Sequence, residues 1–138
     1  MEKIKYDGTS PWKNFSIDEI KCQHTGRLPL DSEGYWLESW MLFMHKLQLL
    51  RDLHGYPIKV SSMYRHKTHP IELKKTTKGQ HTVGACDIVC SGQVAYKLLT
   101  YAIEIGFTGL GFNQSGEHSK RFLHVDNRPF ADRVIWSY

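Results

Sequence analysis

Residues 81–88 read His-Thr-Val-Gly-Ala-Cys-Asp-Ile, and residues 124–126 read His-Val-Asp. Together the two segments offer imidazole nitrogens and carboxylate oxygens around a turn of small residues. Zinc binds neutral histidine nitrogen and carboxylate oxygen, and a catalytic zinc site uses three protein ligands and keeps a fourth position for water. Because the two segments lie far apart in the sequence, only the fold can bring them together. The pattern therefore predicts a metal site that depends on the tertiary structure.

Both segments are expected to lie on strands. The segment 85–90 is apolar apart from Asp87, and an unpaired carboxylate would be costly to bury there. His124 and Asp126 are two residues apart, so both side chains project from the same face of a strand. A core histidine paired with an aspartate would explain His124 and Asp126 alone. A second inward carboxylate together with His81 is hard to explain as packing.

The other patterns predict two helices at the start of the chain. Ser16-Ile17-Asp18-Glu19 is a capping box and predicts a short helix over 17–21. A long helix is expected to begin after Asp31 or Ser32, to end at His54 and to be closed by Gly55. Its core-facing stripe repeats at steps of three and four residues and consists of Trp36, Trp40, Phe43, Leu47, Leu50 and His54.

The remainder of the chain predicts short strands and one further helix. Strands are expected over 58–62, 85–90 and 134–138, with a hairpin of 108–112 and 121–126. Residues 63–80 are basic and polar and predict a long loop, and a helix is expected over 93–105. Two main helices with segregated short strands indicate an α+β fold with a mostly antiparallel sheet.

Length and composition describe one domain over residues 1–138. With 138 residues and 41% hydrophobic residues, the chain can build a single core. No stretch approaches the roughly 20 apolar residues that cross a bilayer, and no apolar segment follows the basic N-terminus, so neither membrane insertion nor a secretory signal is expected. The net charge of +4 suggests an anionic partner, and both nucleic acid and the bacterial cell wall satisfy that criterion.

Three cysteines, Cys22, Cys86 and Cys90, are an odd number and do not make a disulfide framework. We expect Cys86 and Cys90 to be packing residues, because a separation of four residues along a strand places them about 13 Å apart. His24 follows Cys22 by two residues, which is a weak pattern for a second metal site.

Four motifs stand in a fixed order along the chain: Ser62-Met63-Tyr64-Arg65, the segment 81–88, Thr108-Gly109-Leu110-Gly111-Phe112, and the segment 121–126. This ordered set resembles the zinc D-alanyl-D-alanine carboxypeptidases and related phage murein endopeptidases, whose pattern is S-G-Y-R, H-x-x-G-x-A-x-D-I, G-x-G and F-x-H-x-D. The resemblance covers nearly the whole chain, and both ends look like small bacteriophage-type members. It implies a hedgehog/D-Ala-D-Ala peptidase-like α+β fold.

The resemblance also implies roles for individual residues. It makes His81, Asp87 and His124 the zinc ligands. It makes Arg65 the group that holds a substrate carboxylate or carbonyl, a role that suits its planar fork of donors. Ser62 would help to shape the same pocket.

One departure from the family pattern concerns spacing. The family separates its first histidine and its aspartate by seven residues, whereas His81 and Asp87 are separated by six. We expect the backbone around Gly84 to absorb the difference, since glycine adopts positive φ at the lowest cost.

A second departure concerns the general base. Several relatives carry a carboxylate three residues before the last zinc histidine, where this chain has Arg121. Asp126 is the substitute that we expect, because it shares a strand face with His124 and a carboxylate near the metal's water can accept its proton. Glu117 and His118 are further candidates.

We therefore expect a monomeric zinc peptidase that cleaves peptide bonds next to D-amino acids in peptidoglycan stem peptides, as a carboxypeptidase or an endopeptidase. It would not bind nucleic acid. His66, in the loop after Arg65, is either a solvent-exposed residue or a substrate contact. The missing signal fits a phage lysin made in the host cytoplasm and released to the cell wall, or a virion component.

Two rival interpretations remain at this stage. One is a catalytically silent, zinc-bearing domain that binds the cell wall. The other is a metal-dependent nuclease in which residues 124–127, His-Val-Asp-Asn, serve a magnesium site.

Overall fold

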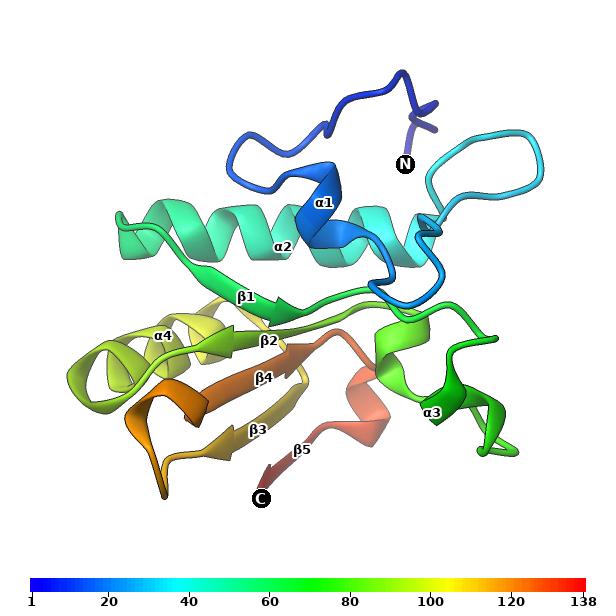
Figure 1. The fold of residues 1–138 in the computed structure, drawn as a ribbon. Helices are drawn as coiled ribbons and strands as arrows, with labels where there is room; N and C mark the ends of the chain where they lie inside the picture. The colour runs from blue at the N-terminus through cyan, green and yellow to red at the C-terminus, as the bar shows by residue number, and fades with distance from the viewer.

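A five-stranded sheet forms the centre of the fold in the computed structural model, which describes all 138 residues (Figure 1). The strand order is β1-β2-β4-β3-β5. Three neighbouring pairs are antiparallel and only the pair β3–β5 is parallel, so the α+β fold with a mostly antiparallel sheet is confirmed. The strands are β1 (Lys59–Ser62), β2 (Ala85–Val89), β3 (Gly109–Asn113), β4 (Phe122–Asp126) and β5 (Val134–Ser137).

Two long helices account for most of the helical residues, and both end where the sequence predicts. α2 (Glu38–His54) stops at Gly55 and α4 (Gly92–Ile105) stops at Gly106, and both glycines are left-handed, with φ of 78° and 98°. The short elements are α1 (Ile17–Ile20), α3 (Pro70–Leu73) and the 3₁₀ turns η1 (Gln80–Thr82), η2 (His118–Lys120) and η3 (Phe130–Asp132). The capping box at the start of α1 is present, with both of its reciprocal hydrogen bonds between Ser16 and Glu19.

The structure corrects two predicted elements. α2 begins at Glu38 and not after Asp31 or Ser32, because the Asp31 carboxylate accepts the backbone N–H groups of Glu33 and Tyr35 and holds a turn. The predicted loop 63–80 contains the helix α3, which has Pro70 at its first position, where proline costs no hydrogen bond.

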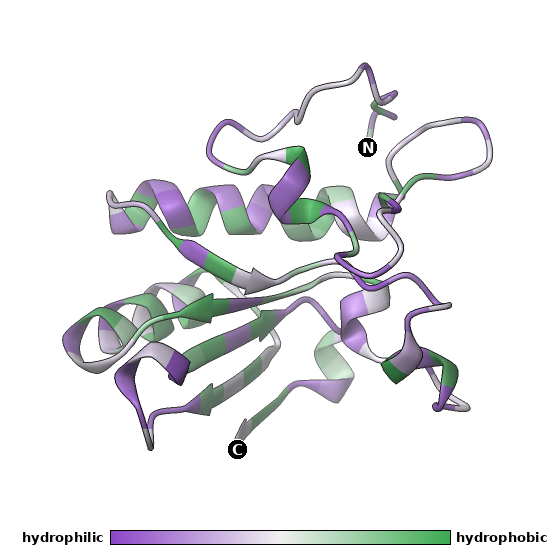
Figure 2. Cartoon of the chain, in the orientation of Figure 1, coloured by the Kyte–Doolittle hydropathy of each residue, from purple (hydrophilic) through white to green (hydrophobic).

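The core lies between the two long helices and one face of the sheet. All six residues of the predicted stripe are buried, and all of them except His54 belong to a cluster of 23 buried hydrophobic residues. On the central strands Cys86, Ile88, Leu123 and Val125 belong to this cluster. Apolar residues accordingly colour much of α2, α4 and the central strands in Figure 2. Since side chains alternate along a strand, Asp87, His124 and Asp126 lie on the opposite face of the sheet.

The cysteines behave as predicted. Cys22, Cys86 and Cys90 are free and buried. None of the helices combines the length and the apolar character that crossing a membrane requires.

Candidate metal centre

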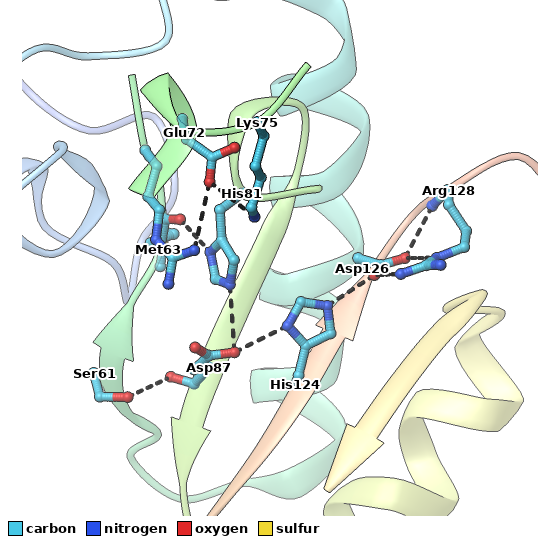
Figure 3. A network of polar contacts seen from close by, with 10 residues as sticks. Ser61, Met63, Glu72, Lys75, His81, Asp87, His124, Asp126 and Arg128 are labelled. Atoms are coloured by element: carbon cyan, nitrogen blue, oxygen red, sulfur yellow. Dashed lines mark hydrogen bonds and ion pairs between the residues drawn. The ribbon is translucent and has the colours of Figure 1, made fainter. Parts of the chain in front are cut away.

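The pairing of β2 with β4 brings the two sequence segments together. Asp87 and His124 are direct cross-strand partners, so their side chains lie side by side on the face of the sheet away from the helices. His124 Nδ1 is 3.0 Å from Asp87 Oδ1, and His81 Nε2 from the turn η1 is 3.5 Å from the same oxygen. One donor atom from each of the three residues lies within 4.8 Å of the others. Figure 3 shows the three side chains converging.

His81 is held in place by its backbone and by its ring. Its Nδ1–H donates to the Met63 carbonyl oxygen at 2.7 Å, which leaves Nε2 to face Asp87. The next residue, Thr82, accepts a hydrogen bond on its carbonyl from the indole Nε1 of Trp40 at 3.2 Å. These bonds fix both the tautomer and the direction of the imidazole, as a metal ligand requires.

Gly84 lies between His81 and Asp87 and has the positive φ that was predicted for it. Its φ is +154°, a value that residues with side chains rarely adopt. A Cβ added there would lie 2.9 Å from Cβ of Phe43 in α2, so the turn between η1 and β2 packs directly on the helix. Glycine is therefore required by both the backbone and the packing.

We expect the substitution Gly84→Val to weaken zinc binding although Gly84 contacts no donor. Backbone strain and overpacking each cost about 1–3 kcal/mol, and both would displace His81 relative to Asp87. The measurement is a zinc titration together with thermal melting. Gly92→Val is the matched control, because Gly92 also has positive φ, +59°, but has open space around it. Zinc affinity equal to that of the parent would show that the turn tolerates a side chain.

His124 is held between two carboxylates. Its Nδ1 faces Asp87, while Nε2 is 2.8 Å from Asp126 Oδ2 on the other side of the ring. Asp126 is fully buried and also accepts two hydrogen bonds from the Arg128 guanidinium, at 2.9 and 2.6 Å. Asp126 therefore supports the imidazole from behind, and its carboxylate does not face the space between the three donors. This geometry does not favour the general-base role predicted for it.

The charges around His124 suit a cation. Burial raises the pKa of Asp87, but the neighbouring imidazoles of His124 and His81 outweigh it and hold that pKa well below its usual range. Burial likewise raises the pKa of Asp126, and hydrogen bonds from Arg128 and His124 lower it to about 2. Burial lowers the pKa of His124, but its bonds to the two carboxylates raise it above its ordinary value. Two ionised carboxylates thus stabilise positive charge at this imidazole.

The donor set fits zinc. It consists of two imidazole nitrogens and one carboxylate oxygen, each directed by a further hydrogen-bond partner or by strand pairing. A backbone carbonyl behind one histidine and a carboxylate behind the other are common supports of zinc-bound histidine. Three protein ligands are the number found in catalytic zinc sites.

The comparison with known families agrees with this site. The family described as peptidase M15 matches residues 13–126, a segment that contains His81, Asp87 and His124. The chain belongs to the peptidase M15 family. This membership confirms the resemblance inferred from the motifs at the level of the family and supports a metal-dependent peptidase. No curated protein and no solved structure matches the chain.

Two of the three residues predicted to bind substrate contact the ligand-bearing segments of this M15 chain through the backbone. The backbone N–H of Arg65 donates to the His81 carbonyl oxygen at 2.8 Å, so Arg65 adjoins a predicted ligand. Ser62 is the cross-strand partner of Asp87 on β1. His66 Nδ1 is instead engaged by Thr68, both by its hydroxyl at 2.8 Å and by its backbone N–H at 3.2 Å.

The further candidates for general base lie elsewhere. Glu117 and His118 are exposed, on the connection between β3 and β4, and neither side chain makes a hydrogen bond or ion pair with the three donors. Arg121 donates to the Gly116 carbonyl oxygen in the same connection. Asp87 is thus the only carboxylate of the metal-binding group.

Sequence reasoning missed two residues beside the centre. Arg128 pairs with Asp126, and a buried aspartate without a known partner was the signal that could have indicated it. Trp136 on β5 lies with its ring centroid 5.1 Å from that of His124 and directly over Gly111, where any Cβ would collide with the indole. Glycine within a strand often marks such a close approach, so the Gly-x-Gly motif carried this information.

Proposed function

We propose that this chain is a zinc-dependent peptidase that cleaves peptide bonds next to D-amino acids in bacterial peptidoglycan. The observation that carries the proposal is the convergence of His81, Asp87 and His124 in a chain of the peptidase M15 family. We further propose that the protein is a monomer. It would reach the cell wall either by phage-type release from the host cell or as part of a virion.

The side chains around the metal centre have different roles in binding the metal and in orienting the substrate. His81, Asp87 and His124 would hold the metal, and a zinc ion there would supply Lewis acidity toward a peptide carbonyl and would lower the pKa of water at the site toward about 7. Asp126 keeps the proton of His124 on Nε2, so that Nδ1 stays available to the metal. Arg65, joined to His81 through the backbone, would donate to a substrate carboxylate or carbonyl and fix the peptide beside the centre.

Two measurements on purified protein test the proposal. Metal analysis without chelators should find about one equivalent of zinc per chain, as a three-ligand site predicts. Incubation with purified murein, followed by mass spectrometry of the soluble fragments, should show peptide products whose masses identify the bond that is cut. Chelator-treated protein is the control. Zinc near zero after supplementation would refute the metal site, and cleavage of plasmid DNA would favour a nuclease.

A catalytically silent, zinc-bearing domain is the second candidate, and one observation favours it. Arg121 occupies the position of the carboxylate that serves as base in several relatives, and Asp126 is engaged by Arg128 and His124. Such a domain would bind one zinc ion and sediment with murein but release no fragments. Fragment release by the wild type that is lost on chelation excludes it.

A further inference from the structure

Glu72, on the short helix α3, is a fully buried carboxylate outside the metal centre. Its Oε1 accepts the backbone N–H of Gly79 at 2.7 Å. Its Oε2 is buried and makes no hydrogen bond, and it has only two cations near it, Lys75 Nζ at 3.5 Å and Arg65 Nη1 at 3.6 Å. Figure 3 shows Glu72 and Lys75 beside His81. A carboxylate that is removed from water in this way needs a compensating role or partner.

Glu72 is charged in the folded protein. Burial raises the pKa of Glu72, but the Gly79 amide, Lys75 and Arg65 together hold it below its ordinary value. The loop 63–80 thus closes around one negative charge, with Arg65 at its start and Gly79 at its end. The residues that follow Gly79 form η1, which carries His81.

Arg65 has no other partner for its guanidinium. Its backbone is fixed by the bond from its N–H to the His81 carbonyl, but its side chain makes no hydrogen bond, and Glu72 is its one ionic partner. The side chain is 22% exposed, so part of the guanidinium remains available to a ligand. An arginine has five N–H donors in a fixed plane, and an ionic contact at Nη1 restrains the plane while it leaves the other edge free.

We propose that Glu72 is a positioning residue that orients the Arg65 guanidinium toward the substrate carboxylate or carbonyl. The inference rests on the proposed function for the identity of the ligand that Arg65 holds. In this role Glu72 contacts Arg65 and does not contact the substrate itself. Because it also binds Gly79, it sets the guanidinium relative to the same turn that presents His81.

The substitution Glu72→Gln tests this role, since glutamine can keep the bond to Gly79 while the charge is lost. In the zinc-loaded enzyme acting on murein stem peptides, we expect KM to rise about 10-fold, within the coupling range of contacting residues. We expect kcat to change less than about 3-fold, as for loss of a binding interaction. Zinc stoichiometry should stay at that of the wild type.

A double-mutant cycle separates positioning from a merely structural role. In an Arg65→Ala background, Glu72→Gln should change KM less than about 2-fold, because the group that it orients is already gone. An equal effect in both backgrounds would overturn the proposal. Lys75→Gln is the matched control, since it removes the other cation beside the same oxygen and should leave KM within about 2-fold of the wild type.

A relaxation measurement needs no activity assay, and its first comparison uses the wild-type protein alone. The Nε–Hε group of Arg65 should be more ordered by ¹⁵N relaxation than that of the exposed Arg27, and Glu72→Gln should remove the difference. Equal disorder of the two arginines in the wild type would overturn the proposal. An ordered Arg65 in a protein that releases no murein fragments would refute the proposed function and leave the positioning intact. If the enzyme is active but the order of the Arg65 Nε–Hε group does not change in Glu72→Gln, the positioning role alone would be refuted.

Discussion

Replacing His124 with alanine is expected to abolish zinc binding at micromolar metal and to reduce peptide hydrolysis to background. His124 supplies one of only three donors, and its ring lies between Asp87 and Asp126. If a zinc-binding free energy of at least ~10 kcal/mol is shared among three ligands, loss of one lowers affinity on the order of 10²- to 10³-fold. The two negative charges left without the imidazole would also destabilise the centre. Zinc titration and the murein assay measure the two effects.

The matched control for His124→Ala is His24→Ala. His24 is exposed, its ring centroid lies 5.4 Å from that of His69 with the two rings tilted, and it takes no part in the group of three donors. This variant should bind one equivalent of zinc with unchanged affinity. If His124→Ala kept the affinity of the parent, the ligand set would be wrong. If both variants lost zinc, general destabilisation would explain the result better than the loss of a ligand.

Much of the site follows from local patterns. Alternation along the strands predicts that His124 and Asp126 share a face, and the structure confirms it. Asp87 was expected to point inward, but it lies with them on the face opposite the core cluster, because its two neighbours along β2 occupy the core face. The left-handed conformation of Gly55 and the positive φ of Gly84 follow from the conformational freedom of glycine. These features depend on residues that are close in sequence, and their physical causes are correspondingly visible there.

Other features depend on contacts that no local pattern contains. The start of α2 moves to Glu38 because Asp31 caps a turn in place of a helix. The partner of Glu72 is Arg65, seven residues away across a loop whose path the sequence leaves open. The direction of Asp126 is decided by Arg128, which lies beyond the end of β4. Alternation along a strand predicts that two side chains share a face. It does not predict which ring nitrogen of His124 contacts which carboxylate.

The direction of Asp126 changes the result expected for Asp126→Asn. The substitution keeps the shape but removes the charge that holds the proton of His124 on Nε2 and that pairs with Arg128. Loss of such a support behind a metal ligand typically lowers metal affinity 10- to 100-fold. We therefore expect weaker zinc binding in a titration, together with hydrolysis that is low at limiting zinc and recovers as zinc is raised.

Zinc dependence separates this role from general-base catalysis. A general base would give normal zinc affinity with turnover reduced on the order of 10²- to 10⁴-fold at every zinc concentration, because the lost proton acceptor is not restored by metal. Asp18→Asn is the control, since it removes the same charge from a side chain that is 86% exposed and pairs only with Lys21. Intact zinc binding with collapsed turnover in Asp126→Asn would return the catalytic role to Asp126. Recovery of hydrolysis with added zinc requires instead that the carboxylate act through His124, as its position behind the imidazole indicates.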